Sequence, residues 1–118
     1  MGQRESTEDL IESMRQVIRT NEATREALAA NAALLQTCVA RLEAGEDIVE
    51  VLRSTPGGTG RARVKATEEA QHAARLAFRA HLIAACMAGG MSRKEIATVM
   101  GFSPQLVSRY AKVARELA

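Results

Sequence analysis

Residues 91–118 read MSRKEIATVMGFSPQLVSRYAKVARELA, and they carry the strongest local structural signals in the chain. Ser92 and Glu95 have the spacing of a capping box, in which a serine hydroxyl accepts from the third amide of a helix. Gly101 is suited to end that helix, because glycine adopts positive φ at little cost. Ser103 is suited to cap a second helix, with Pro104 at its first position. The segment therefore predicts two capped helices joined by a short turn.

Apolar residues recur along both predicted helices, and two hydrophobic staples (Met91 with Ile96, Phe102 with Val107) fix how the chain enters them. The apolar positions are Ile96, Met100, Phe102, Val107 and Tyr110. Together with the small Ala97 and the turn residue Gly101, this pattern resembles the helix-turn-helix family of DNA-binding domains. The likeness is to the compact three-helix form of bacterial regulators, sigma-factor-like domains and recombinase tails. The resemblance implies that the helix from Pro104 lies in the major groove of DNA.

Polar and basic residues occupy the remaining positions of the second predicted helix. Gln105 has the chemistry to pair bidentately with adenine, and Arg109 with guanine. The other candidates suit phosphate contacts, which position a protein on DNA without reading its sequence. The predicted DNA-binding residues are Arg93, Lys94, Ser103, Pro104, Gln105, Ser108, Arg109 and Lys112, with Arg61 and Arg63 on a basic arm. Such an arm would enter a minor groove; a solvated linker end is the alternative for Arg61 and Arg63. A helical hairpin that binds proteins is the alternative for the whole segment.

The charge of the chain is divided unevenly along its 118 residues. The formal net charge is +2. Residues 1–60 hold six basic and ten acidic side chains, whereas residues 61–118 hold ten basic and four acidic ones. Clustered cations favour a polyanionic partner, because they neutralise phosphates and release counterions. A solvated basic surface is the alternative explanation.

A long helix is predicted before residue 45, with Ser6 or Thr7 as its cap. Apolar residues follow it at alternating spacings of three and four, which is the pattern of a coiled-coil seam. The predicted dimerisation residues are Ile11, Met14, Ile18, Leu28, Leu35, Val39 and Leu42, and the polar Asn21 and Arg25 interrupt the series. Because a lone helix would leave this stripe in water, we expect it to pack against the same helix of a second chain. Packing within one chain, on itself or on the basic half, is the alternative.

The domain organisation follows from turn-forming residues between the two halves. Residues 1–53 are predicted as a helical dimerisation segment that ends in a short helix over 47–53. Residues 54–63, which include Pro56 and several glycines, are predicted as a flexible linker. Residues 64–118 are predicted as the DNA-binding domain, with a first helix over 64–88 that ends at Gly89 and Gly90. The fold class expected is therefore all-α, a long N-terminal helix followed by a helix-turn-helix domain.

Composition argues against several other functions. Aromatic residues are 3% of the chain, too few for stacking platforms that hold single-stranded nucleic acid. Cys38 and Cys86 are expected as buried thiols, and His72 and His81 lack metal-ligand spacing, so neither a metal nor a cofactor is expected. No catalytic signature is present, and an enzyme is not expected. No segment reaches the apolar length of a membrane span, and the first ten residues lack a signal core. We expect a cytoplasmic, nucleoid-associated protein.

These signals together predict a sequence-specific duplex DNA-binding protein, a bacterial-type transcriptional regulator that acts as a homodimer. One alternative is an adaptor whose N-terminal helix binds a partner protein through Asn21 and Arg25. Another is a nucleoid protein that binds DNA without regard to sequence.

Overall fold

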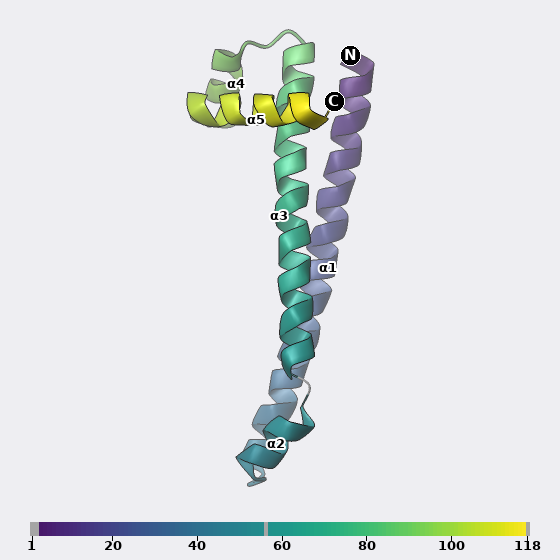
Figure 1. Cartoon of the computed structure of the whole chain (residues 1–118), viewed down its shortest axis with the longest axis vertical. Coiled ribbons are helices and arrows are strands. Elements are labelled where there is room, and N and C mark those ends of the chain that lie inside the picture. The colour runs from purple at the N-terminus through teal and green to yellow at the C-terminus, as the bar shows by residue number, and fades with distance from the viewer. Residues whose placement is uncertain (1–2, 56, 118) are drawn as a thin grey trace. The chain divides into compact units, whose positions relative to one another are not determined.

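The computed structural model describes residues 3–55 and 57–117, which form five helices and contain no strand (Figure 1). The helices are α1 (Gln3–Glu43), α2 (Ile48–Ser54), α3 (Gly57–Ala88), α4 (Arg93–Met100) and α5 (Pro104–Leu117). The predicted all-α class and its long N-terminal helix are therefore confirmed. The chain divides into two compact units: the first contains Met1–Ile18 and His72–Ala118, and the second contains Arg19–Gln71.

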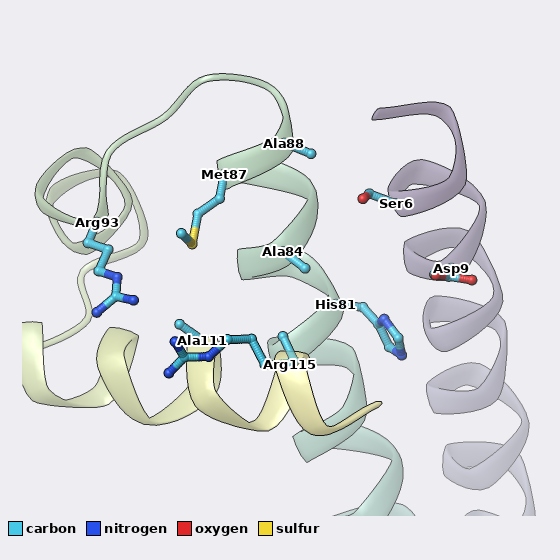
Figure 2. Close-up of a pocket in the computed structure, with 10 residues that line it drawn as sticks. Ser6, Asp9, His81, Ala84, Met87, Ala88, Arg93, Ala111 and Arg115 are labelled. Atoms are coloured by element: carbon cyan, nitrogen blue, oxygen red, sulfur yellow. The ribbon is translucent and has the colours of Figure 1, made fainter. Parts of the chain in front are cut away.

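The start of α1 differs from the prediction. The helix begins at Gln3, so neither Ser6 nor Thr7 is its cap. Ser6 is buried and lies on the side of α1 that faces Ala84 and Ala88 of α3 (Figure 2). Its small side chain fits where two helices approach closely, and this packing role replaces the predicted capping role.

The most buried residues of α1 have small side chains and are spaced by seven, four or three residues, which places them on one face of the helix. The buried residues are Ser6, Ser13, Thr20, Thr24 and Ala27. In the second unit this face meets α3, where the Thr24 hydroxyl donates to the Thr67 carbonyl at 3.3 Å and the Gln71 amide donates to Asn21.

The two long helices of the second unit, α1 and α3, run antiparallel and approach closely at Gly60. A Cβ on this glycine would lie only 3.3 Å from the side-chain oxygen of Asn31. The residue pairs joined between the helices, 24 with 67 and 31 with 60, show the opposite chain directions. Small residues along both partners therefore set the spacing of this pair.

The predicted apolar stripe of α1 lies one residue further along than the buried face. One residue corresponds to a rotation of about 100° around a helix, so the stripe lies to one side of the face that packs on α3. Its members are 40–62% exposed: Ile11, Met14, Ile18, Leu28, Leu35, Val39 and Leu42. Within one chain, α1 thus packs mainly through small and polar residues, with Leu10, Val17 and Leu34 half-buried beside them, and leaves the seven residues of the stripe exposed.

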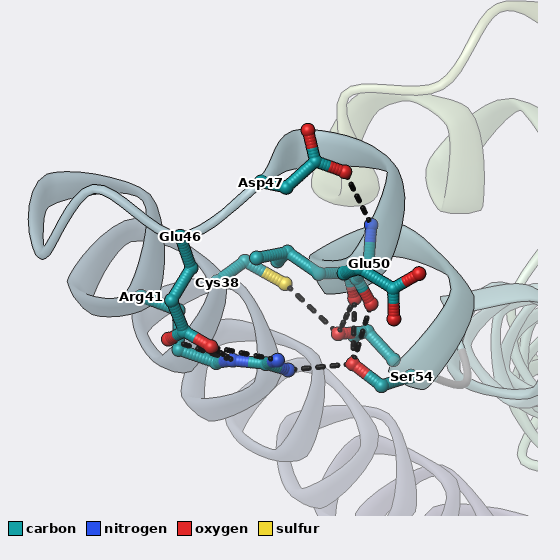
Figure 3. A network of polar contacts seen from close by, with 8 residues as sticks. Cys38, Arg41, Glu46, Asp47, Glu50 and Ser54 are labelled. Carbon is teal, nitrogen blue, oxygen red and sulfur yellow. Dashed lines mark hydrogen bonds and ion pairs between the residues drawn. The ribbon is translucent and has the colours of Figure 1, made fainter.

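The corner between α1 and α2 is built from a glycine turn and a polar network (Figure 3). Gly45 has a φ of 86° after the last turn of α1, and Asp47 caps α2 by accepting from the Glu50 amide at 3.2 Å. The Arg41 guanidinium donates to Glu46 at 3.1 Å and to the Ser54 hydroxyl at 2.6 Å. The hydrogen bond that Arg41 donates to the Glu46 carboxylate raises the pKa of Arg41. This network holds α2 against the end of α1. The short helix predicted over 47–53 is therefore present as α2.

The flexible linker predicted over 54–63 is largely helical. α2 ends at Ser54 and α3 begins at Gly57, while Pro56 lies outside the described residues. Gly60, one of the glycines that indicated a linker, instead allows α3 to approach α1 closely, because it lies against Asn31 and Leu34. Arg61 and Arg63 are exposed residues of α3. The flexible basic arm is therefore a wrong prediction, since both arginines are held on a helix.

Candidate nucleic-acid interface

The end of α3 is followed by two short helices whose caps match the sequence signals. Gly90, with a φ of 99°, ends the turn after α3, and the Ser92 hydroxyl accepts from the Glu95 amide at 3.1 Å to cap α4. The carboxylate of Glu95 accepts from the same hydroxyl at 3.5 Å. The two polar groups of the predicted capping box are thus in contact.

A three-residue turn connects α4 to α5. Gly101 has a φ of 68°, and the amide that follows it, that of Phe102, donates to the Ala97 carbonyl at 3.0 Å. The Ser103 hydroxyl accepts from the Leu106 amide at 3.1 Å, and α5 begins at Pro104. The turn residue, the second cap and the first helical position are those predicted from the sequence.

One hydrophobic core holds the end of α3, α4 and α5 together. Its buried members are Ile83, Ile96, Ala97, Val107, Tyr110 and Ala111, and Cys86, Met91, Met100, Phe102 and Leu106 pack around them. Ile83, Ile96 and Val107 have no exposed surface. This core fixes which side of α5 faces inward.

Tyr110 also makes a polar contact that the sequence did not indicate. The Arg79 guanidinium donates to the Tyr110 hydroxyl at 2.9 Å, and its carbon lies 5.8 Å from the centre of the tyrosine ring. The Phe102 ring lies 6.2 Å from the same ring, tilted by 57°. The contact between α3 and α5 therefore satisfies the only polar atom of the tyrosine side chain. No local pattern would have found it, because Arg79 and Tyr110 are 31 residues apart.

The side of α5 opposite this core presents the predicted DNA-binding residues to solvent. The exposed side chains are Ser103, Pro104, Gln105, Ser108, Arg109 and Lys112. Gln105, Arg109 and Lys112 share one face, since they are spaced at four and three residues on a helix. Arg93 and Lys94 are exposed at the start of α4. These six residues, together with Arg93 and Lys94, all belong to the first unit.

A groove of about 550 Å³ lies between α4 and α5. It is lined by Arg93, Lys94, Ala97, Thr98, Phe102, Pro104 and Ser108. The structure therefore brings four of the predicted residues (Arg93, Lys94, Pro104 and Ser108) to one concave surface. Thr98 belongs to the same surface but was not predicted. Its position one turn after Lys94 is the signal that would have indicated it.

The remaining candidates lie elsewhere. Arg61 and Arg63 belong to the second unit. Asn21 and Arg25, which interrupt the apolar stripe, have partners within the chain: Asn21 accepts from Gln71, and Arg25 pairs with Glu22 at 3.2 Å. Their polar groups therefore need no second protein.

The two cysteines lie in different units, Cys38 in the second and Cys86 in the first. Both are free and half-buried. The Cys38 thiol contacts the Thr55 hydroxyl at 3.6 Å, and burial raises the pKa of the Cys86 thiol. A raised pKa lowers the fraction of thiolate, the nucleophilic form.

The described part of the chain shows no group of three or more acidic, histidine or cysteine side chains placed to hold a metal. Within the same residues, every helix is too short or too polar to cross a lipid bilayer. Comparison with known proteins finds no family model that matches the chain, and no curated protein or solved structure with significant similarity to it.

Proposed function

We propose that this protein binds duplex DNA sequence-specifically through α5 and regulates transcription as a homodimer. One observation carries the proposal. The inner face of α5 is locked by Val107, Tyr110 and Ala111, so Gln105 and Arg109 are held outward on a rigid helix. A helix of this width fits the major groove of B-DNA.

The chemistry of the exposed face suits both parts of DNA recognition. Gln105 and Arg109 carry donors and acceptors that match the base edges of adenine and guanine. Lys112, Arg93 and Lys94 suit phosphate oxygens, and the amides at the start of a helix also favour phosphate. Residues 91–118 hold five basic and two acidic side chains. Affinity should therefore fall as salt concentration rises, because bound phosphates release counterions.

Two charge-removing variants separate base reading from phosphate binding. We expect Arg109→Ala to weaken binding to preferred sites by about 1–3 kcal/mol while changing binding to random duplexes little. Lys112→Ala should weaken binding to all duplexes alike. It should also reduce the slope of log affinity against log salt concentration by about 1, the contribution of one phosphate contact. The measurement is a salt-dependent fluorescence anisotropy titration with sites first selected from a random duplex pool.

Equal losses on selected and random DNA for both variants would contradict base reading by Arg109. If the selection yields no preferred sequence although the chain binds duplexes, the nucleoid alternative is favoured. No binding to any duplex would reject the proposed function.

The exposed stripe of α1 supports the homodimer. Seven apolar residues at coiled-coil spacing stay 40–62% exposed although α1 already packs against α3 within the second unit. A soluble helix rarely leaves such a regular stripe in water. The α1 of a second copy carries the same stripe with the same period, so two copies are self-complementary. Dimerisation also raises the affinity of paired DNA-binding surfaces through effective concentration.

Two separate variants test the dimer: one places a glutamate in the stripe, and the other places a glutamate on α1 outside the stripe. Leu35→Glu would bury an unpaired carboxylate between two copies, and we expect the dissociation constant of the dimer to rise by at least about tenfold. Ala33→Glu, exposed on the same helix but outside the stripe, should leave it unchanged. Sedimentation equilibrium gives both constants. A wild-type chain that is monomeric at tens of micromolar would contradict the dimer and favour a partner protein on α1.

A further inference from the structure

A second cavity, of about 500 Å³, lies in the first unit, next to α5 but away from the exposed face described above (Figure 2). Its walls come from α1, the end of α3, the start of α4 and the end of α5. The lining residues are Ser6, Asp9, His81, Ala84, Met87, Ala88, Arg93, Ala111, Ala114 and Arg115. The volume falls within the range of small-molecule sites.

Short side chains create this cavity. Four of the lining residues are alanines, and longer side chains at these positions would fill the space. Met87 adds a flexible apolar side chain, which adapts to ligands of different shape. The middle of the cavity is therefore apolar and suited to a short hydrocarbon group.

Two guanidinium groups lie at one end of the cavity. Figure 2 shows Arg93 from α4 and Arg115 from α5 extending toward the same space, beside Met87 and Ala111. Neither arginine forms a salt bridge with the residues that the structure describes. An arginine pairs with a carboxylate through two parallel hydrogen bonds.

The end of the cavity opposite the two arginines is lined by different ionisable groups. His81 extends from α3 toward Asp9 of α1 (Figure 2). Asp9, the lone acidic residue of the lining, thus lies on α1, away from the two guanidinium groups of α4 and α5. Charge in the cavity is therefore polarised, with its positive end at Arg93 and Arg115.

We infer that this cavity binds a small organic carboxylate, with the carboxylate at Arg93 and Arg115 and a short apolar chain over the alanines. Arg93 also lines the groove between α4 and α5, so a carboxylate and a DNA phosphate compete for the same guanidinium. Occupancy of the cavity therefore weakens DNA binding. This last step rests on the proposed function, whereas the carboxylate site does not.

Hexanoate is a suitable probe, and hexanamide is its uncharged counterpart of nearly the same shape. With the full chain labelled at methionine methyl groups, hexanoate should shift the Met87 resonance saturably, and hexanamide should not at the same concentrations. Arg115→Gln should weaken hexanoate binding by about tenfold or more, because charge-assisted hydrogen bonds are lost. Ala114→Leu should abolish binding by filling the cavity. Arg75→Gln, the same charge change at an exposed site of α3 outside the lining, should have no effect.

Absence of a saturable Met87 shift would overturn the site, as would equal effects of hexanoate and hexanamide or unchanged binding in both Arg115→Gln and Ala114→Leu. The coupling is measured separately, as DNA affinity with and without saturating hexanoate. Hexanoate that binds but leaves DNA affinity unchanged would overturn the competition for Arg93. If the chain binds hexanoate but no DNA, the carboxylate site is supported and the proposed function fails.

Discussion

Replacing Ile96 with alanine should lower the free energy of unfolding of the first unit by about 2–5 kcal/mol. Ile96 has no exposed surface and packs in one core with residues of α3 and α5. The loss combines the transfer of the removed carbons with the cavity left behind. Natural domains are stable by only about 5–15 kcal/mol. The variant is therefore expected to lose a large part of the stability that orients α5.

The matched control lies on the same helix. Val99 of α4 is 67% exposed, so Val99→Ala removes a β-branched residue without opening a cavity. Both substitutions gain the helix propensity of alanine, and the difference between them isolates core packing. Urea unfolding followed by circular dichroism measures both. Equal stability of the two variants would mean that α4 does not pack through Ile96.

The sequence predicted the α4–α5 region in detail because its signals are local. Ser92, Gly101 and Ser103 each act on backbone groups within a few residues, so their effect does not depend on the rest of the fold. The apolar residues between them recur with the period of a helix, and this spacing identifies which face of α4 and of α5 is buried. The exposed positions of Gln105 and Arg109 follow from the same period.

The packing of α1 against α3 was predicted less well because the most buried residues of α1 are small and mostly polar. The larger apolar residues mark a stripe on α1, whereas the face that packs within the chain consists of residues such as Ser13, Thr20 and Ala27. A pattern search ranks leucine and isoleucine above serine and threonine and therefore finds the stripe one residue away. Gly60 was also interpreted wrongly. The sequence indicated that it was part of a linker, whereas it lies where two helices approach closely.

Non-local features of the first unit were beyond the reach of sequence patterns. The hydrogen bond from Arg79 to Tyr110 joins two helices, and the cavity lined by both Arg93 and Arg115 brings together residues of α4 and α5. Spacing along the chain says nothing about such pairs. They arise only once the core has fixed how α3, α4 and α5 cross.

Replacing Gly101 with valine should destabilise the first unit by about 1–3 kcal/mol through backbone strain alone. Gly101 has a φ of 68°, and a Cβ added there would meet no atom within 4 Å. The cost therefore comes from the left-handed conformation and not from a steric clash with neighbouring residues. Valine is the severe case because its branched Cβ is poorly tolerated at positive φ.

A graded series distinguishes strain from other causes. Asparagine tolerates the left-handed region better than alanine, and alanine better than valine, so stability should fall in the order Gly101, Asn, Ala, Val. Gly89→Ala is the control, since Gly89 lies in the preceding turn without a positive φ; it should be neutral or stabilising by about 0.4–1 kcal/mol. Thermal and urea unfolding measure the series. The hydrogen bond from the Phe102 amide to the Ala97 carbonyl spans this turn, so a variant that relaxes the strain should also reorient α5 and, under the proposed function, should lose specific DNA binding along with stability. A series in which valine is as stable as glycine would show that α4 and α5 are joined by a different turn.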